Sequence, residues 1–379
     1  METFEAWVHT GGWSVSVACL IRAVSLLYRF VHGPAPSYSG PAGRNGTAAT
    51  QHSAAHGPEG TSTLTHAYRI ELTPPDITPY RAGNTGIDFV TTLDSGRSGP
   101  HVLVNALTHG NELCGPVALD FLFRQGVRPV RGTLTLCFAN TAAYQCFDPK
   151  RPGNSRFVDE DFNRVWAEDV LDGPRRSVEL ERARTLRPLY DTVDLLLDLH
   201  SMQNATAPLV LCGATDRGRD LAKAVGVPEW VVRDSGHAAG RRLLDYAPFV
   251  DPAARKTALL AECGQHWAAS SADVAIEVTL RFLLATGTVT PEFAAPHLPP
   301  TPPPPQKVIE ITEAVTMAGS DFLYEADYVG MEIIERAGTL IAHDDDREIR
   351  TPYDDCVLIM PSRRLRRGQT AVRLGRIVS

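Results

Sequence analysis

The chain has 379 residues, enough for two domains, and its 43% apolar and 21% charged residues are typical of a soluble globular enzyme. Lys and Arg number 37 against 44 Asp and Glu, and this net charge of -7 excludes a broadly basic nucleic-acid-binding surface. The seven cysteines are scattered without a CxxC pair, which favours reduced thiols and a cytoplasmic protein over a disulfide framework.

The first 66 residues are expected to lie outside the globular fold. Arg22 interrupts the apolar stretch Trp13–Val31, which is therefore shorter than the roughly 20 residues of a membrane-spanning helix. Glu2 and Glu5 precede it, whereas a signal peptide begins with positive charge. Residues 33–65 are rich in Gly, Pro, Ala, Ser and Thr, so residues 1–66 form a predicted disordered extension without a membrane anchor.

From residue 67 to residue 295, short apolar runs alternate with helical patterns. Several runs are apolar at nearly every position, as is typical of strands covered on both faces by helices. We therefore predict an α/β/α sandwich with a mixed central sheet in this segment. The predicted strands are His101–Leu107, Thr133–Ala139, Leu195–Leu199, Pro208–Cys212 and Thr257–Ala261, and the predicted helices are Gly115–Arg124, Val178–Tyr190, Arg217–Val225 and Ser271–Leu284.

A proline-rich segment, residues 296–306, separates this region from the C-terminal part of the chain. Four consecutive prolines within it favour extended polyproline II geometry and predict a linker. Beyond the linker, β-prone pieces occur at Lys307–Thr312, Gly338–Ala342 and Cys356–Ile359, divided by Gly, Asp and Pro. They predict a small all-β domain over residues 307–379.

Two histidines and one glutamate stand at the ends of predicted strands. His109 and Glu112 follow the strand that ends at Leu107, and His200 follows the strand Leu195–Leu199. Because ligands gather at the carboxyl ends of strands in α/β sheets, we expect the three side chains to meet. An HxxE or DLH motif alone occurs often by chance, but two imidazoles and one carboxylate together predict a hydrolytic Zn²⁺ site, with one ion per chain.

Four motifs in this order resemble the succinylglutamate desuccinylase/aspartoacylase family, which is similar in fold to the zinc carboxypeptidases. The resemblance covers residues from about 68 to 379 and implies a carboxypeptidase-like sandwich with a smaller C-terminal β domain. The motifs are THGNE at 108–112, NSRFVDEDFNRVW at 154–166, DLHS at 198–201 and AECG at 261–264.

The resemblance implies a role for each matching position. His109, Glu112 and His200 would bind the zinc ion. Glu262 would be the general base that deprotonates the zinc-bound water, and Arg156 would polarise the scissile carbonyl and stabilise the oxyanion. The residues alone favour a strand-end carboxylate paired with an arginine for Glu262, and only the resemblance reverses this. Arg156 and Arg164 could likewise be ordinary surface residues.

The substrate-binding positions are less completely matched. Asn163 and Arg164 would hold a carboxylate of the substrate, for which the planar guanidinium is well suited. The family also uses a tyrosine from the C-terminal domain, and Tyr324, Tyr328 and Tyr353 are the candidates here. The sequence does not identify the acyl group or the amino acid of the substrate.

The sequence thus predicts a zinc-dependent amidohydrolase, a deacylase that acts on amide bonds other than peptide bonds. Its substrate would be a small N-acyl amino acid, with neither nucleic acid nor membrane as a partner, and homo-oligomer formation is left open. Among the other histidines, His266, four residues after Glu262, could line the pocket. The alternatives are a carboxypeptidase-like metallopeptidase and a zinc-binding module without activity.

Overall fold

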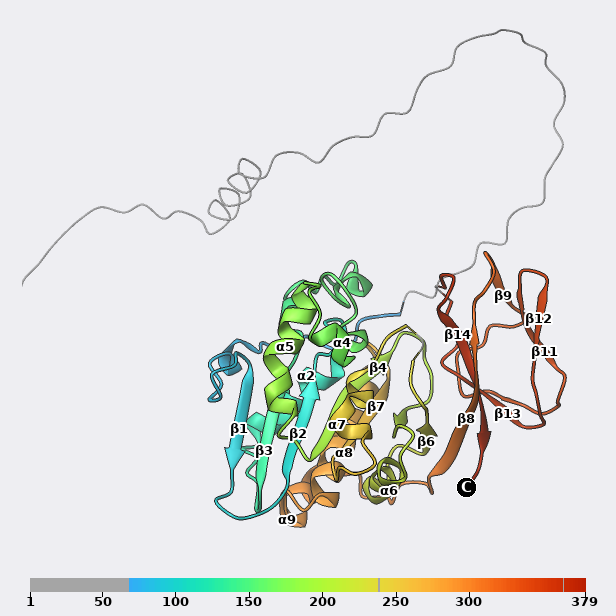
Figure 1. Cartoon of the computed structure of the whole chain (residues 1–379). Helices are drawn as coiled ribbons and strands as arrows, with labels where there is room; N and C mark the ends of the chain where they lie inside the picture. Colours follow the sequence, from blue (N-terminus) through green and yellow to red (C-terminus); the bar gives the residue numbers. More distant parts are fainter. Residues whose placement is uncertain (1–67, 238, 364) are drawn as a thin grey trace, which may run out of the picture. The chain divides into compact units, whose positions relative to one another are not determined.

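The computed structural model describes residues 68–237, 239–363 and 365–379, so the predicted extension at residues 1–66 lies outside the described residues. Within these residues, eleven strands form one mixed sheet and three form a second sheet (Figure 1). No helix in this part of the chain is both long and apolar enough to cross a membrane.

The helices and strands follow the sequence-based expectation closely, and every element predicted for residues 67–295 is present. The order across the large sheet is β1-β3-β2-β4-β7-β5-β6-β8-β14-β13-β10. The strands are β1 (Val90–Asp94), β2 (His101–Ala106), β3 (Thr133–Phe138), β4 (Leu195–Met202), β5 (Leu209–Leu211), β6 (Trp230–Arg233), β7 (Thr257–Gln265), β8 (Lys307–Thr316), β9 (Phe322–Tyr324), β10 (Ile333–Ile334), β11 (Leu340–Asp344), β12 (Arg347–Arg350), β13 (Cys356–Ile359) and β14 (Thr370–Ile377). The α-helices are α2 (Cys114–Arg124), α3 (Thr141–Gln145), α4 (Glu168–Leu171), α5 (Val178–Tyr190), α6 (Asp216–Val225), α7 (Ala247–Val250), α8 (Ala269–Ala285) and α9 (Pro291–Ala294).

Helices cover the central part of the large sheet on both faces, which confirms the predicted α/β/α sandwich (Figure 1). One buried cluster contains side chains of α2, α6 and α8, and the other contains side chains of α4, α5 and α7. Successive side chains of a strand point to opposite faces. Leu197 and Leu199 of β4 accordingly pack with α8, whereas Leu196 packs with α5.

This alternation places the polar side chains of the inner strands on one face of the sheet. β2, β4 and β7 are parallel neighbours, and His200 of β4 lies in register with Glu262 of β7. The odd-numbered apolar residues of β7, Leu259 and Ala261, join the α8 side. His200 and Glu262 therefore lie on the α5 side, at the carboxyl ends of their strands, where α/β folds bind ligands.

The C-terminal antiparallel β region expected from the sequence is present, and it continues the large sheet. β8 pairs in parallel with β6, with Val231 opposite Val308, and β14, β13 and β10 follow in antiparallel order. β9, β11 and β12 form the separate three-stranded sheet (Figure 1). The domain boundaries at residues 295 and 307 stay predictions, because the sheet itself runs from β6 into β8.

Candidate metal centre

The loop after β2 is shaped by a close approach between two segments. Leu107 has a positive φ of 62°, and its carbonyl accepts a hydrogen bond of 2.8 Å from the backbone N–H of Asn140. Gly110 donates its N–H to the carbonyl of Arg156 at 3.1 Å, and a Cβ added to Gly110 would lie 2.5 Å from the carbonyl oxygen of Ser155. Glycine is required here because the backbones nearly touch.

The three predicted ligands meet. Candidate ligand atoms of His109, Glu112 and His200 all lie within 4.8 Å of one another, and the side chains are 2–3% exposed. Nδ1 of His109 is 2.7 Å from Oε1 of Glu112, and Nδ1 of His200 is 3.1 Å from Oε2 of the same carboxylate. The loop after β2 and the end of β4 thus direct the Nδ1 edge of each imidazole at a single carboxylate.

The Nε2 atom of each imidazole, on the ring edge away from Glu112, contacts a second carboxylate. Nε2 of His200 lies 2.8 Å from Oδ2 of Asp198, and Nε2 of His109 lies 3.0 Å from Oδ1 of Asp161. With a metal ion bound, a carboxylate on Nε2 would favour the tautomer that carries its proton there and would leave the lone pair of Nδ1 for the metal. Both Nδ1 atoms face Glu112, so a divalent metal ion bound there would have two imidazole nitrogens and one carboxylate as its ligands.

Asp198 is itself fixed by neutral donors. Its Oδ1 accepts hydrogen bonds from Nδ2 of Asn105 at 2.8 Å and from the hydroxyl of Thr108 at 2.9 Å. Tyr190 of α5 donates its hydroxyl to Oδ1 of Asn105 at 2.8 Å, which fixes the orientation of the amide. A buried carboxylate needs such partners, and this network supplies them to Asp198.

The donor set fits Zn²⁺ in its chemistry. Burial raises the pKa of Glu112, but His109 and His200 outweigh burial and hold it well below the usual range. The ionised carboxylate also accepts the backbone N–H of Ser201 at 3.2 Å. Two imidazole nitrogens and one carboxylate in a buried site are the ligands of hydrolytic zinc centres.

Glu262 and Arg156, the other two residues with a predicted role in the reaction, border the triad. Oε2 of Glu262 is buried and has no hydrogen-bond partner among the described residues. Burial, with a smaller contribution from Glu112, raises the pKa of Glu262 to about 8. Arg156 lies 3.4 Å from Oε1 of Glu112 and 3.1 Å from Oδ2 of Asp161, so its guanidinium reaches the same centre.

His266 also lies close to the centre. Its Nδ1 is 2.8 Å from the hydroxyl of Ser201, the residue after His200, and the side chain is buried. Burial lowers the pKa of His266 to about 4, so the ring is neutral. It supports the backbone that carries His200 and Ser201.

Sequence reasoning missed Glu179, which shapes the segment that carries Arg156. This fully buried carboxylate in the first turn of α5 accepts the backbone N–H of Val158 at 2.7 Å, of Asp159 at 3.0 Å and of Glu160 at 3.2 Å. Nothing in the sequence distinguishes Glu179 from Glu181, because both lie near the start of one helix.

Glu179→Gln is expected to lower both the melting temperature and kcat. An amide nitrogen cannot accept the N–H groups of Asp159 and Glu160, and buried donors without partners cost about 1–3 kcal/mol. The loop that carries Arg156 would then loosen. Thermal unfolding and steady-state kinetics test this, with the half-exposed Glu181→Gln as the matched control. Identical values for the two variants would contradict the role of Glu179.

Asn163 and Arg164, predicted to bind the substrate, lie in the 3-10 helix η3 (Phe162–Arg164). Asn163 is buried, and its Oδ1 accepts the backbone N–H of Leu243 at 2.8 Å, so the amide oxygen already anchors a neighbouring loop. Arg164 donates only to the carbonyl of Asn163, at 2.6 Å, and forms no ion pair with a described carboxylate. Its guanidinium therefore keeps donors for an anion.

The three candidate tyrosines of the C-terminal region have other partners. Tyr324 donates its hydroxyl to the carbonyl of Ala371 at 2.7 Å, and the hydroxyl of Tyr353 is 2.6 Å from that of Thr312. Tyr328 packs edge-on against Tyr324, and all three tyrosines pack against the core of the C-terminal β region. The structure does not bring these tyrosines to the triad.

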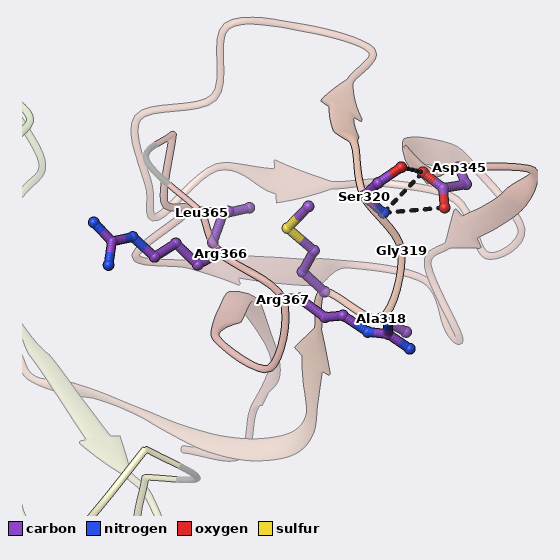
Figure 2. A pocket seen from close by; sticks show the side chains of 8 residues that line it. Ala318, Gly319, Ser320, Asp345, Leu365, Arg366 and Arg367 are labelled. Atoms are coloured by element: carbon purple, nitrogen blue, oxygen red, sulfur yellow. Dashed lines mark hydrogen bonds between the residues drawn. The ribbon is translucent and has the colours of Figure 1, made fainter. Parts of the chain in front are cut away.

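A hollow of about 460 Å³ lies in the C-terminal region, apart from the triad (Figure 2). Its lining includes Arg366, Arg367 and Asp345. Oδ1 of Asp345 accepts the backbone N–H of Ser320 at 3.1 Å and of Asp321 at 2.9 Å. This carboxylate braces a turn.

Comparison with known proteins agrees with the geometry. Residues 98–245 match the model of the succinylglutamate desuccinylase/aspartoacylase catalytic domain. This part of the chain is similar to that family. The desuccinylase/aspartoacylase match includes the triad, Arg156 and Arg164, and it ends before Glu262. The family consists of hydrolases that remove acyl groups, so the general prediction of a deacylase is supported. No curated protein matched the chain.

Solved structures of the desuccinylase/aspartoacylase family share the fold. Succinylglutamate desuccinylase from Vibrio cholerae has a TM-score of 0.58 at 18% identity, covering 76% of this chain and 85% of its own. A succinylglutamate desuccinylase/aspartoacylase from Rhodobacter sphaeroides gives 0.57 at 19% identity, covering 76% and 89%. The product-bound ectoine utilization protein EutE (DoeB) from Ruegeria pomeroyi gives 0.53 at 16% identity, covering 77% and 92%.

Proposed function

We propose that the chain is a zinc-dependent amidohydrolase that cleaves the amide bond of an N-acyl amino acid. The observation that carries the proposal is the orientation of His109 and His200, whose Nδ1 atoms both face the buried carboxylate of Glu112. Carboxylates hold both Nε2 atoms from behind. A zinc ion held by these residues would polarise the substrate carbonyl and lower the pKa of an attacking water.

The surrounding residues would carry the proton and the charges. Glu262 would take the proton of the water that attacks the acyl carbon, and would pass it to the nitrogen as the C–N bond breaks. A cation in the triad would favour the ionised form of Glu262, whose pKa is raised to about 8 without it. Arg156 would donate to the carbonyl oxygen as negative charge develops there, and Arg164 would bind a carboxylate of the substrate.

Arg164→Ala is expected to raise KM for N-acyl amino acids about 10- to 100-fold and to change kcat much less, because charge-assisted hydrogen bonds contribute about 1.5–3 kcal/mol to ground-state binding. Initial rates over a range of substrate concentrations test this. Arg151→Ala, which removes an exposed arginine of the same segment, is the control. An unchanged KM for Arg164→Ala would remove the carboxylate clamp from the mechanism.

The experiment that tests the proposal measures bound zinc and hydrolysis of acetyl, succinyl and formyl amino acids by one preparation. About one zinc ion per chain, with release of the free amino acid, is the expected result. Cleavage of peptides alone would make the chain a carboxypeptidase-like metallopeptidase. Bound zinc without any hydrolysis would indicate a zinc-binding module without activity. Absence of bound zinc would contradict the proposal.

We further propose that this hydrolase is cytoplasmic and handles small molecules. The six described cysteines are free thiols, and all but Cys146 are buried. The acidic net charge of -7 argues against nucleic acid as a partner.

A further inference from the structure

Strand β7 contains one extra residue just after Glu262. His200 of β4 lies opposite Glu262, but Met202 lies opposite Gln265, so two residues of β7 face one residue of β4 at this point. Gly264 has a positive φ of 111° there, and the nearest neighbour of an added Cβ would be 3.9 Å away. The backbone conformation, and not a lack of space, therefore favours glycine. Such a bulge redirects the side chains that follow it, and bulges are frequent next to active sites.

The bulge directs His266 at the strand that carries a metal ligand. In a regular strand, His266 would lie on the same face as Glu262, four residues earlier. Because Gln265 lies opposite Met202, which packs on the α5 side, His266 takes the other side instead. Its Nδ1 lies 2.8 Å from the hydroxyl of Ser201, and its backbone N–H donates to the carbonyl of Met202 at 2.8 Å. Ser201 and His266 are each only 4% exposed.

Ser201 connects His266 to one of the three predicted metal ligands. The backbone N–H of Ser201 donates to Oε2 of Glu112 at 3.2 Å, and the same oxygen lies 3.1 Å from Nδ1 of His200. The hydroxyl of Ser201 has no partner other than His266 among the described residues. Removal of the imidazole would therefore leave a buried hydroxyl without a partner, at the residue whose N–H holds Glu112.

The residues on either side of His266 contact both segments that carry metal ligands. Nε1 of Trp267 donates to the carbonyl of Asn111, in the loop after β2, at 3.2 Å. Nε2 of Gln265 donates to the carbonyl of Gln203, just beyond β4, at 3.2 Å, and its Oε1 accepts the N–H of Trp267 at 2.9 Å. Residues 265–267 thus join the loop after β2 to the end of β4.

We propose that His266 is a positioning residue that, together with Ser201, fixes the carboxylate of Glu112 in the orientation that metal binding requires. The inference rests on the proposed function, because it concerns the same zinc site. His266 is not one of the three side chains whose ligand atoms converge, so it acts on the metal ion through Ser201 and Glu112. Groups that orient a metal ligand typically change metal affinity about 10- to 100-fold when they are removed.

The test compares the zinc affinity of the wild type, Ser201→Ala and His266→Leu, measured by competition with a zinc chelator. We expect the dissociation constant for zinc to rise about 10- to 100-fold in each variant. His101→Leu is the matched control, because Nε2 of His101 lies 2.8 Å from the hydroxyl of Thr135 at the amino end of β2, the end away from the triad. An unchanged dissociation constant in His266→Leu, or an equal rise in His101→Leu, would overturn the inference.

Two further measurements distinguish positioning of the ligand from a general loss of stability. With Co²⁺ in place of zinc, the visible absorption bands depend on the geometry of the ligands, and we expect them to change in Ser201→Ala and His266→Leu but not in His101→Leu. The double variant of Ser201 and His266 should lose no more zinc affinity than either single variant, because the two residues act as one unit. Unchanged Co²⁺ bands or additive losses would overturn the inference. Ser201→Ala alone carries the test if His266→Leu does not fold.

Zinc affinity is measured without substrate, which separates this inference from the proposed function. A wild type that binds zinc but cleaves no N-acyl amino acid would contradict the proposed function, and weaker zinc binding in the variants would still support the role of His266. Wild-type zinc affinity in both variants of an active hydrolase would overturn this inference alone. A wild type that binds no zinc would overturn both.

Discussion

Glu262→Gln is expected to retain zinc and to lower kcat about 10²- to 10⁴-fold, the contribution typical of a general acid–base group. The carboxamide has nearly the same shape as the carboxylate but cannot accept a proton at neutral pH. Oε2 of Glu262 is buried without a partner among the described residues, so the substitution breaks no hydrogen bond of that atom. His109, Glu112 and His200 stay in place, which separates loss of the base from loss of the metal.

Zinc content, melting temperature and single-turnover rates would be measured on the same preparation of Glu262→Gln. Glu277→Gln is the control, because Glu277 lies on α8 in an ion pair of 2.8 Å with Arg281. Near-normal turnover in Glu262→Gln, with zinc bound, would remove this residue from the mechanism. A loss of zinc would show instead that Glu262 supports the metal.

His200→Ala is expected to abolish stoichiometric zinc binding and, with it, hydrolysis. The substitution removes one of the three donors and leaves Asp198 buried without its 2.8 Å partner. An unpaired buried charge destabilises the fold, so the melting temperature should fall as well. Asp198→Asn keeps the imidazole and removes only the charge behind it, for which a 10- to 100-fold weaker metal affinity is typical.

The measurement is zinc content after dialysis against chelators of increasing strength, followed by turnover with and without added zinc. We expect His200→Ala to lose zinc first, Asp198→Asn next and the wild type last. His297→Ala is the control, because this half-buried histidine packs against Phe121 with ring centroids 5.0 Å apart. Full zinc occupancy and normal turnover in His200→Ala would show that the triad is not the metal site.

Much of the fold and the triad could be predicted from the sequence because their signals are local. Apolar runs bounded by polar turns predict strands, and the helix Val178–Tyr190 has the bounds that its pattern indicates. His109 and His200 directly follow two such runs, so parallel strands alone bring them to one edge of the sheet. The close approach at Gly110 is different, since only the packing of Ala143 and Ser155 shows why glycine is needed there.

The tertiary structure alone decided which polar residues support the site. Glu179 binds a loop about twenty residues away, and Asp161 holds His109. Hydrogen-bond periodicity and side-chain alternation are properties of neighbouring residues, and the sequence therefore determined the strands, the helices and the residues at their ends. Ion pairs join residues that are distant in the chain, so the partners of each charged residue depend on how the strands and loops pack. A local sequence pattern therefore cannot predict these partners.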